Sequence, residues 1–270
     1  MSVRAWLGAA ALLATLVATR TAGAAHVEGG EIQLPGAGHD RVGVELETAR
    51  FDLGTQGQGS YFSTIARVDW AATRRLTLRT RVPLHFLDLA GQAGREGLGD
   101  VEVRLRWRLT MRDPLLVAVG YTGQLPTGDD ARGLGGGALQ LAPYATAGYR
   151  IDATVIFVTL NDTLTLRSAS TLRLPSSKRS VNYVDPNSDH ELRYNAGLIY
   201  FFSDVVAASA MLNGVTILTD EERGHTLFTG GAQLGIAPLP GWRFVIGGQL
   251  PSLGDKRFDW KLNAALIYSF

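Results

Sequence analysis

The sequence predicts an all-β protein, a transmembrane antiparallel up-and-down β-barrel of about 12 strands. Three observations predict this fold. Apolar and polar residues alternate along the chain, the alternating segments are long enough to cross a bilayer as tilted strands, and the connections between them alternate between short and long. From residue 40 onward the hydrophobic period is two, which is the period of a strand rather than of a helix.

The composition of the chain is that of one folded domain. The 270 residues are 46% hydrophobic and 9% aromatic, values that exclude a disordered chain. The formal net charge of +1 gives no reason to expect a nucleic-acid partner. The absence of cysteine excludes disulfide scaffolds, cysteine-bound metals and thiol nucleophiles.

The first 24 residues read as a secretory signal peptide. Arg4 is followed by an apolar run over 5–18, and Ala22 and Ala24 occupy the −3 and −1 positions of a cleavage site. No later apolar stretch approaches the length of a membrane-spanning helix. We therefore expect an exported chain with a short periplasmic segment at 25–39 and a barrel at 40–270.

Alternation is clearest between Val101 and Met111, where apolar residues at odd positions are interleaved with Glu102, Arg104, Arg106 and Arg108. A strand places the two sets on opposite faces. Most segments are longer than the strands of about 5–6 residues that are typical of soluble domains. The predicted strands are 40–50, 61–71, 76–87, 99–111, 115–125, 138–149, 153–174, 190–202, 205–218, 225–237, 242–250 and 258–270.

The connections follow a parity that a soluble sandwich has no reason to keep. Those after the even-numbered segments are short, at 72–75, 112–114, 150–152, 203–204 and 238–241. Those after the odd-numbered segments are longer, for example 88–98, 127–137 and 175–189. Short periplasmic turns and longer external loops are typical of an outer-membrane barrel. The segment 153–174 is too long for one crossing, and a hairpin at Asn161-Asp162 is the alternative to one long, projecting strand.

Aromatic residues are predicted to form two girdles on the apolar face. The girdle near the short turns comprises Trp70, Trp107, Tyr149, Phe202, Trp242 and Phe270, and the girdle near the long loops comprises Phe62, Phe86, Phe228, Phe258 and Trp260.

The carboxyl terminus, with Leu266, Tyr268 and Phe270, resembles the terminal signal of outer-membrane proteins. The resemblance implies recognition of Phe270 by the barrel assembly machinery.

Two short motifs carry a family resemblance. Gly97-Leu98-Gly99-Asp100 opens the fourth predicted strand, and Leu125-Pro126-Thr127-Gly128-Asp129 closes the fifth. The pair resembles the outer-membrane transporter family described as "putative MetA-pathway of phenol degradation". The resemblance implies an outer-membrane channel for passive passage of small molecules, aromatic or apolar compounds among them, with no catalytic residue and no cofactor. The loop-motif residues are Gly97, Gly99, Asp100, Pro126, Thr127, Gly128 and Asp129.

The same motifs also have a purely structural interpretation. Glycine permits positive φ and aspartate bonds to nearby backbone, so these segments suit tight loops. Carboxylates of Asp100, Asp129 and Asp130 at a loop rim would suit Ca²⁺, but the structural interpretation is favoured and no metal site is predicted.

If the apolar face meets lipid, the polar face lines the lumen. Arginine outnumbers lysine 23 to 3 in the chain. One interpretation is that carboxylates and guanidinium groups brace the interior, and the other is that a basic constriction selects anions or hydroxylated solutes. Both remain open. The predicted lumen-lining residues are Glu45, Glu47, Arg67, Arg79, Arg81, Glu102, Arg104, Arg106 and Arg108.

Other functions remain as alternatives. A structural or adhesive barrel without transport would share every feature above. A lipid-modifying enzyme would need a serine, a histidine and an orienting Asn or Asp, and the histidines are expected at strand ends and rims instead. These are His26, His39, His85, His190 and His225. The expected partners are outer-membrane lipid, the assembly machinery and a small-molecule solute.

Overall fold

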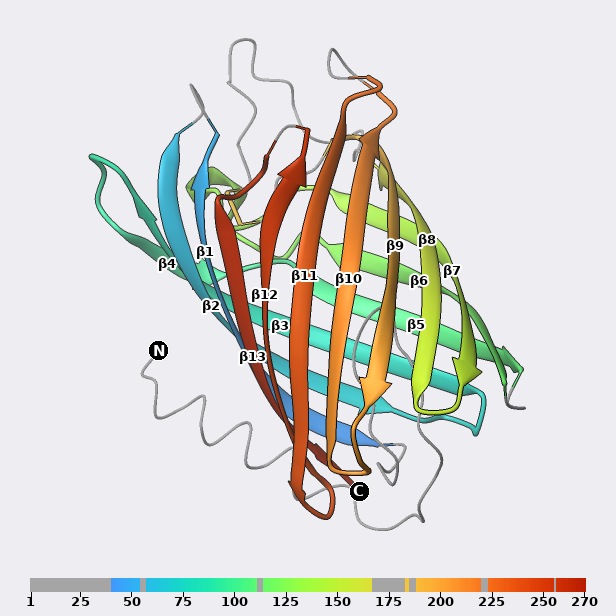
Figure 1. Ribbon diagram of the computed structural model, residues 1–270. Helices are drawn as coiled ribbons and strands as arrows, with labels where there is room; N and C mark the ends of the chain where they lie inside the picture. The colour runs from blue at the N-terminus through green and yellow to red at the C-terminus, as the bar shows by residue number, and fades with distance from the viewer. Residues whose placement is uncertain are drawn as a thin grey trace.

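The computed structural model describes residues 40–53, 57–110, 114–166, 183–184, 188–219, 223–254 and 256–270 (Figure 1). The predicted signal peptide (1–24) and periplasmic segment (25–39) lie outside the described residues. None of the helices in the described ranges is long and apolar enough to cross a membrane.

The described residues form long strands joined into a single sheet. Their bounds are β1 (Arg41–Asp52), β2 (Gln58–Trp70), β3 (Leu76–Leu89), β4 (Arg95–Leu98), β5 (Val101–Thr110), β6 (Leu115–Leu125), β7 (Leu139–Ile151), β8 (Thr154–Leu166), β9 (His190–Phe201), β10 (Val206–Ile217), β11 (Thr226–Leu239), β12 (Trp242–Leu253) and β13 (Trp260–Ser269), with a short 3₁₀ turn, η2, at Asp130–Arg132.

The sheet closes on itself into an antiparallel barrel. Except for β4, each strand pairs with the next along the chain or, for β3, also with β5, and β13 pairs with β1, from Arg41 opposite Ser269 to Arg50 opposite Trp260. Strands β4 and β5 both pair with β3, so they share one position in a closed barrel of 12 strands. The predicted fold class is confirmed.

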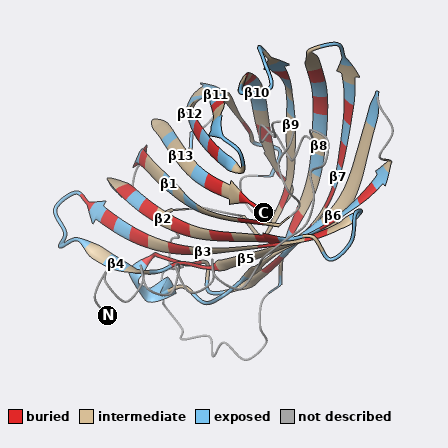
Figure 2. Cartoon of the chain, turned by 90° about the horizontal axis from the view of Figure 1, so that it is seen from below, coloured by how far each residue is buried: buried red, intermediate tan, exposed pale blue. Residues whose placement is uncertain are grey.

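Alternation of side chains separates an apolar outer face from a largely polar inner face. Figure 2 shows buried and exposed residues alternating along the strands. On β5, Leu105, Trp107 and Leu109 are exposed, whereas Arg106 and Arg108 between them are buried. This is the reverse of a soluble protein, and it is the arrangement that suits a barrel surrounded by lipid.

The structure decides whether the predicted segment 153–174 contains a hairpin. Strand β8 runs without a break through Asn161-Asp162, where Asn161 lies opposite Tyr144 on β7 and Arg193 on β9, so the alternative hairpin does not form. The expected extension to residue 174 lies outside the described residues.

The predicted loop at 88–98 is wrong. Strand β3 continues to Leu89 and returns through a turn, in which Gly91 adopts a φ of 75°, to form β4. The reason is that Leu87 and Leu89 keep the strand period and are buried on the inner face, which extends the hairpin. Gly97 therefore lies in a strand and not in a loop.

The connections are short at one end of the barrel, as predicted, but not all connections at the other end are long. The connections at the lower end in Figure 1 are short, at 152–153 between β7 and β8 and at 240–241 between β11 and β12, and the C-terminus lies at this end. The opposite end carries the long connections 126–138 and 167–189. The connections 53–57 and 90–94 at that end are nearly as short as the turns, because β1, β2 and β3 extend further than predicted.

Aromatic side chains of the girdle near the short turns lie on the outer face of the barrel. Trp70, Trp107, Tyr149 and Phe202 are all at least half exposed. Trp242 packs against Tyr268 with ring centroids 4.9 Å apart, and Tyr268 contacts Phe270 edge to face. Phe258 was assigned to the outer face, and that assignment is wrong. It precedes β13 and packs on an inner apolar cluster, because the alternation of a strand does not extend into the loop.

Candidate functional site

The inner face has two different sectors. We call the inward side chains of β1, β2, β3, β5 and β13 the charged wall, and those of β7, β8, β9, β10 and β11 the neutral wall. All the predicted lumen-lining residues belong to the charged wall, where their strand parity directs them away from the exposed apolar face.

Asp69 is the centre of the lower charged wall. Its side chain is 1% exposed and accepts hydrogen bonds from Arg67, at 2.6 and 3.0 Å, and from Arg79, at 2.8 and 3.2 Å. Arg41 lies 3.6 Å from the same carboxylate. Three guanidinium groups from three neighbouring strands therefore converge on one buried carboxylate. Each of these charges has an opposite charge next to it.

Higher in the same wall, Glu45 and Glu47 bind cations across strands. Glu45 pairs with Arg81 at 2.6 Å and with Arg67 at 3.2 Å, and Arg81 also reaches Glu102 at 3.5 Å. Glu47 pairs with Lys261 on β13 at 2.9 Å. The last pair joins the first and last strands of the barrel. These contacts are the geometry expected of a braced interior.

The arginines of β5 differ from one another. Arg106 and Arg108 are buried, at 5% and 6% exposure. Arg104 is half-buried, its Nε–H donates to the Thr122 hydroxyl at 3.1 Å, and its guanidinium carbon lies 5.3 Å from the centre of the Tyr144 ring. In the described part of the chain no carboxylate pairs with Arg104.

The neutral wall is built from hydroxyl and amide groups. Thr146 and Thr159 share a hydrogen bond of 2.9 Å across β7 and β8. Asn195 donates to Asn213, whose amide donates to the Thr229 hydroxyl at 3.2 Å, so the chain of bonds crosses β9, β10 and β11. We call this last chain of residues the amide ladder.

One carboxylate interrupts the neutral wall near the loop end. Glu191 is fully buried and pairs with Arg193 on its own strand at 2.9 Å and with Arg257 from the loop before β13. Its oxygen also accepts the backbone N–H of Ser188 at 2.6 Å. Glu191 thus ties a loop residue to the inner face.

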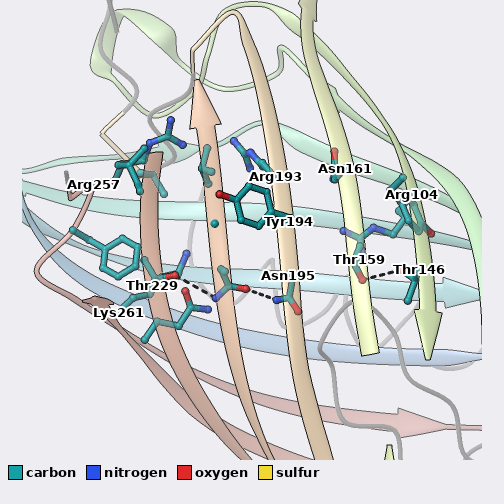
Figure 3. Close-up of a pocket in the computed structure, with 18 of the residues that line it drawn as sticks. Arg104, Thr146, Thr159, Asn161, Arg193, Tyr194, Asn195, Thr229, Arg257 and Lys261 are labelled. Carbon is teal, nitrogen blue, oxygen red and sulfur yellow. Dashed lines mark hydrogen bonds between the residues drawn. The ribbon is translucent and has the colours of Figure 1, made fainter. Parts of the chain in front are cut away.

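The two walls enclose a cavity of about 310 Å³ in the upper part of the barrel. Figure 3 shows Arg104, Thr146 and Thr159 on one side of it, Thr229 and Lys261 on the other, and Asn195 between. The cations around the cavity are Arg104, Arg193, Arg257 and Lys261, and the carboxylates paired with them among the described residues are Glu191 and Glu47. The lining therefore carries an excess of positive charge.

Apolar clusters lie above and below the polar inner surface. Phe51, Leu87 and Leu89 pack with Leu134, which comes from the connection between β6 and β7 and is 1% exposed. Towards the short-turn end, Phe157, Ile199 and Ala207 form a second buried cluster on the inner face of β8, β9 and β10.

The loop-motif residues form a structural junction. Both oxygens of Asp100 accept backbone hydrogen bonds, from Gly128 at 2.9 Å and from Gly136 at 2.6 Å. Thr127 accepts from the Val101 N–H at 2.9 Å and donates to the Gly99 carbonyl at 3.1 Å. The two motifs therefore bind each other, and they hold the 126–138 connection over the break between β4 and β5.

The remaining motif residues support the same junction. Asp129 accepts the Arg132 N–H as the N-cap of η2, and Pro126 follows the end of β6. A Cβ on Gly97 would lie 3.0 Å from Leu134, and one on Gly99 only 2.0 Å from the His85 ring. Among the described residues, no group of three His, Asp or Glu side chains is placed to hold a metal.

His85 is not the rim residue that the sequence suggested. It is buried on β3, and its Nδ1 lies 2.7 Å from the hydroxyl of Ser63 on β2. A serine next to a histidine is the first requirement of a hydrolase, but Ser63 is 0% exposed, so its hydroxyl has no access to a substrate. The pair is part of the packing of the charged wall, and the His85 ring lies against Gly99.

Sequence reasoning missed the residues of the neutral wall. Asn195, Asn213, Thr146, Thr159 and Thr229 follow the same strand parity as the arginines, and that parity was the signal that could have found them. They carry no charge, and uncharged polar residues stand out less from a strand pattern than arginines do. Arg257 and Phe258 lie in a loop, where parity gives no information.

Comparisons with known proteins support the fold. No protein-family model and no curated protein matches the sequence. The structure resembles the crystal structure of the COG4313 outer membrane channel from Pseudomonas putida F1, with a TM-score of 0.63 and 15% identity over 91% of this chain and 100% of that chain. It also resembles the KdgM porin in complex with disordered oligogalacturonate, with a TM-score of 0.52 and 11% identity over 85% of this chain and 99% of the porin.

A third similar structure has a different role. The translocator domain of the autotransporter NalP from Neisseria meningitidis has a TM-score of 0.57 and 11% identity, over 86% of this chain and 89% of the domain. At such identities the similarity shows the barrel fold alone. Function has to be argued from the interior of this chain.

Proposed function

We propose that the protein is an outer-membrane channel for the passive passage of small molecules through an arginine-lined lumen. The observation that carries the proposal is the cavity of about 310 Å³ inside the barrel, whose lining combines cationic, hydroxyl and amide side chains with tyrosine and other apolar surface. A barrel with a purely structural role gains nothing from a polar internal space, whereas a channel requires one.

The excess of positive charge around the cavity supports a preference for anions. Arg104 is the cation on β5 that contacts the cavity without a paired carboxylate in the described residues. The sequence resemblance to the phenol-degradation transporters suggests aromatic or apolar solutes. The lining of threonine and asparagine side chains favours solutes that also carry hydrogen-bonding groups.

The outer surface supports the proposed location in the outer membrane. Large apolar residues cover it, among them Ile156, Leu212 and Leu262, each about half exposed. Lipid is the proposed partner of this surface. The terminal aromatic Phe270, directly after the strand β13 that closes the barrel, is the proposed contact with the assembly machinery, and the signal peptide at 1–24 is the proposed export signal.

Two other functions are alternatives. An adhesive or structural barrel would keep the exposed loops but not require the cavity. A lipid-modifying enzyme would need an accessible nucleophile, and Ser63, the serine bonded to His85, is fully buried. We infer that the protein is not an enzyme.

Conductance in planar bilayers tests the proposal. We expect purified, refolded protein to give discrete current steps, and a reversal potential in a salt gradient that favours anions over cations. Arg104→Ala and Arg106→Ala should lower that preference because each removes a fixed positive charge from the lumen. A folded barrel without conductance or solute flux would contradict the channel, and an unchanged preference in both variants would contradict the basic lumen.

A further inference from the structure

The strongest unassigned feature of the cavity is the guanidinium of Arg104. Its Nε–H is satisfied by Thr122 and its plane lies near Tyr144, but its two terminal nitrogens have no hydrogen-bond partner in the described part of the chain. An arginine presents these nitrogens as a planar fork that matches the two oxygens of a carboxylate. Neutral neighbours hold the fork in place without neutralising its charge.

The surroundings of Arg104 favour a negatively charged ligand. Arg79 lies directly opposite Arg104 in the register of β3 and β5, but it donates two hydrogen bonds to the Asp69 carboxylate, which balances its charge. The Arg104 guanidinium has no such carboxylate among the described residues. The side chain therefore gains from a bound carboxylate that the wall does not provide.

Beside its cations, the cavity lining also offers neutral hydrogen-bonding groups. The Thr229 hydroxyl accepts from Asn213, which leaves its own proton free for an acceptor, and Asn161 accepts from Thr163 at 3.2 Å, which leaves its NH₂ group as a donor. Gln249 also lines the space without a hydrogen bond to another described residue. These groups suit the hydroxyls of a ligand, since a hydroxyl both donates and accepts.

We propose that the cavity is a binding site for small hydroxylated carboxylates, in which Arg104 binds the carboxylate and the amide ladder with Asn161 and Gln249 binds the hydroxyls. The site rests on the proposed channel function and names the class of solute that such a channel would favour. A cavity of about 310 Å³ is at the lower limit for small-molecule sites, which restricts the ligand to a single short chain or ring.

Calorimetric titration of the full-length protein in detergent micelles tests the site without requiring conduction. Gluconate is the probe, sorbitol is the neutral analogue with hydroxyls, and hexanoate is the carboxylate without hydroxyls. A charge-assisted contact and a set of neutral hydrogen bonds should each contribute about tenfold in affinity, so gluconate should bind about tenfold more tightly than either comparison compound.

Substitutions separate the two halves of the site. Arg104→Gln should weaken gluconate about tenfold and leave sorbitol unchanged, and Arg104→Lys should restore only part of the loss because the fork is gone. Asn213→Leu should lower gluconate binding to the level of hexanoate. Thr229→Val makes the same test with a smaller change of shape. Arg74→Gln removes an equal charge from the exposed turn at 71–75 and should change nothing.

Equal binding of gluconate and sorbitol, or wild-type affinity in Arg104→Gln, would overturn the site. Tighter binding of benzoate than of gluconate would overturn the role of the ladder. A conducting channel with either result would leave the proposed channel function intact, whereas specific binding without conductance would support the site and contradict passive passage.

Discussion

The polar side chains of the charged wall are bound by ion pairs, whereas those of the neutral wall are bound mainly by neutral hydrogen bonds. Both must fill the interior of a barrel whose outer surface is apolar. On the charged wall, Asp69, Glu45 and Glu47 bind cations on neighbouring strands over distances of 2.6–3.6 Å. On the neutral wall, threonine and asparagine side chains bond to one another, and Glu191 is the carboxylate of that face with ion pairs among the described residues.

The difference has a consequence for stability. A buried ion pair loses heavily when one partner is removed, because the other charge stays buried. A neutral hydrogen bond contributes only about 1 kcal/mol, and removing both partners is nearly neutral. The charged wall should therefore tolerate substitution poorly and the neutral wall well, which leaves the neutral wall freer to vary with the solute.

Asp69→Asn should have the largest effect on stability. It leaves Arg41, Arg67 and Arg79 around a neutral amide in a site that is almost fully buried. We expect a loss of about 3–5 kcal/mol in the free energy of unfolding, measured by urea titration in lipid vesicles. Asp88→Asn, at an exposed position of β3, is the matched control. Equal stability of the two variants would refute the idea that Asp69 braces the wall.

Glu191→Gln tests the carboxylate of the neutral wall. It breaks the pairs with Arg193 and Arg257, but both cations retain some exposure and can turn towards water. The expected loss of about 2 kcal/mol is therefore smaller than for Asp69. The two freed cations should also raise the preference for anions, measured as a shift in reversal potential. A lowered anion preference would show that Glu191 does not screen the cavity.

The sequence predicts the barrel and the inner face of the charged wall, because strand parity is a fixed geometric rule. Arg104 and Arg106 point inward for the same reason that Leu105 and Trp107 point outward. Parity does not tell which carboxylate meets which cation. The pair of Glu47 with Lys261 depends on the register that joins β1 to β13, residues that are distant in sequence.

Other parts of the site could not be predicted for physical reasons. Arg257 and Phe258 enter the interior from a loop, whose backbone has no period. The sequence does not predict the hairpin of β3 and β4, because β4 has only four residues, too few for an alternating pattern to stand out. The mutual binding of the two loop motifs required spatial proximity that no spacing along the chain reveals.

Asp100→Asn tests the junction that connects the end of the charged wall to the neutral wall. Asparagine keeps one acceptor oxygen and replaces the other by a donor, so its side chain can accept from only one of Gly128 and Gly136. We expect a loss of about 1–2 kcal/mol and faster hydrogen exchange at Gly128 and Gly136. Asp129→Asn, on the exposed N-cap of η2, should change exchange only near Arg132. Unchanged exchange at both Gly128 and Gly136 would contradict the junction.

A double-mutant cycle on Thr146 and Thr159 should give the smallest effect. Either Thr→Val change leaves one hydroxyl on the inner face without its partner at 2.9 Å and should cost about 1 kcal/mol. The double variant should cost less than the sum, because neither hydroxyl then remains to be satisfied. The corresponding cycle on Arg67 and Asp69 should not recover in this way, since Arg41 and Arg79 would still lack their carboxylate. Strict additivity for the threonines would mean that each hydroxyl already bonds to water, and the neutral wall would then be a solvated surface rather than a bonded one.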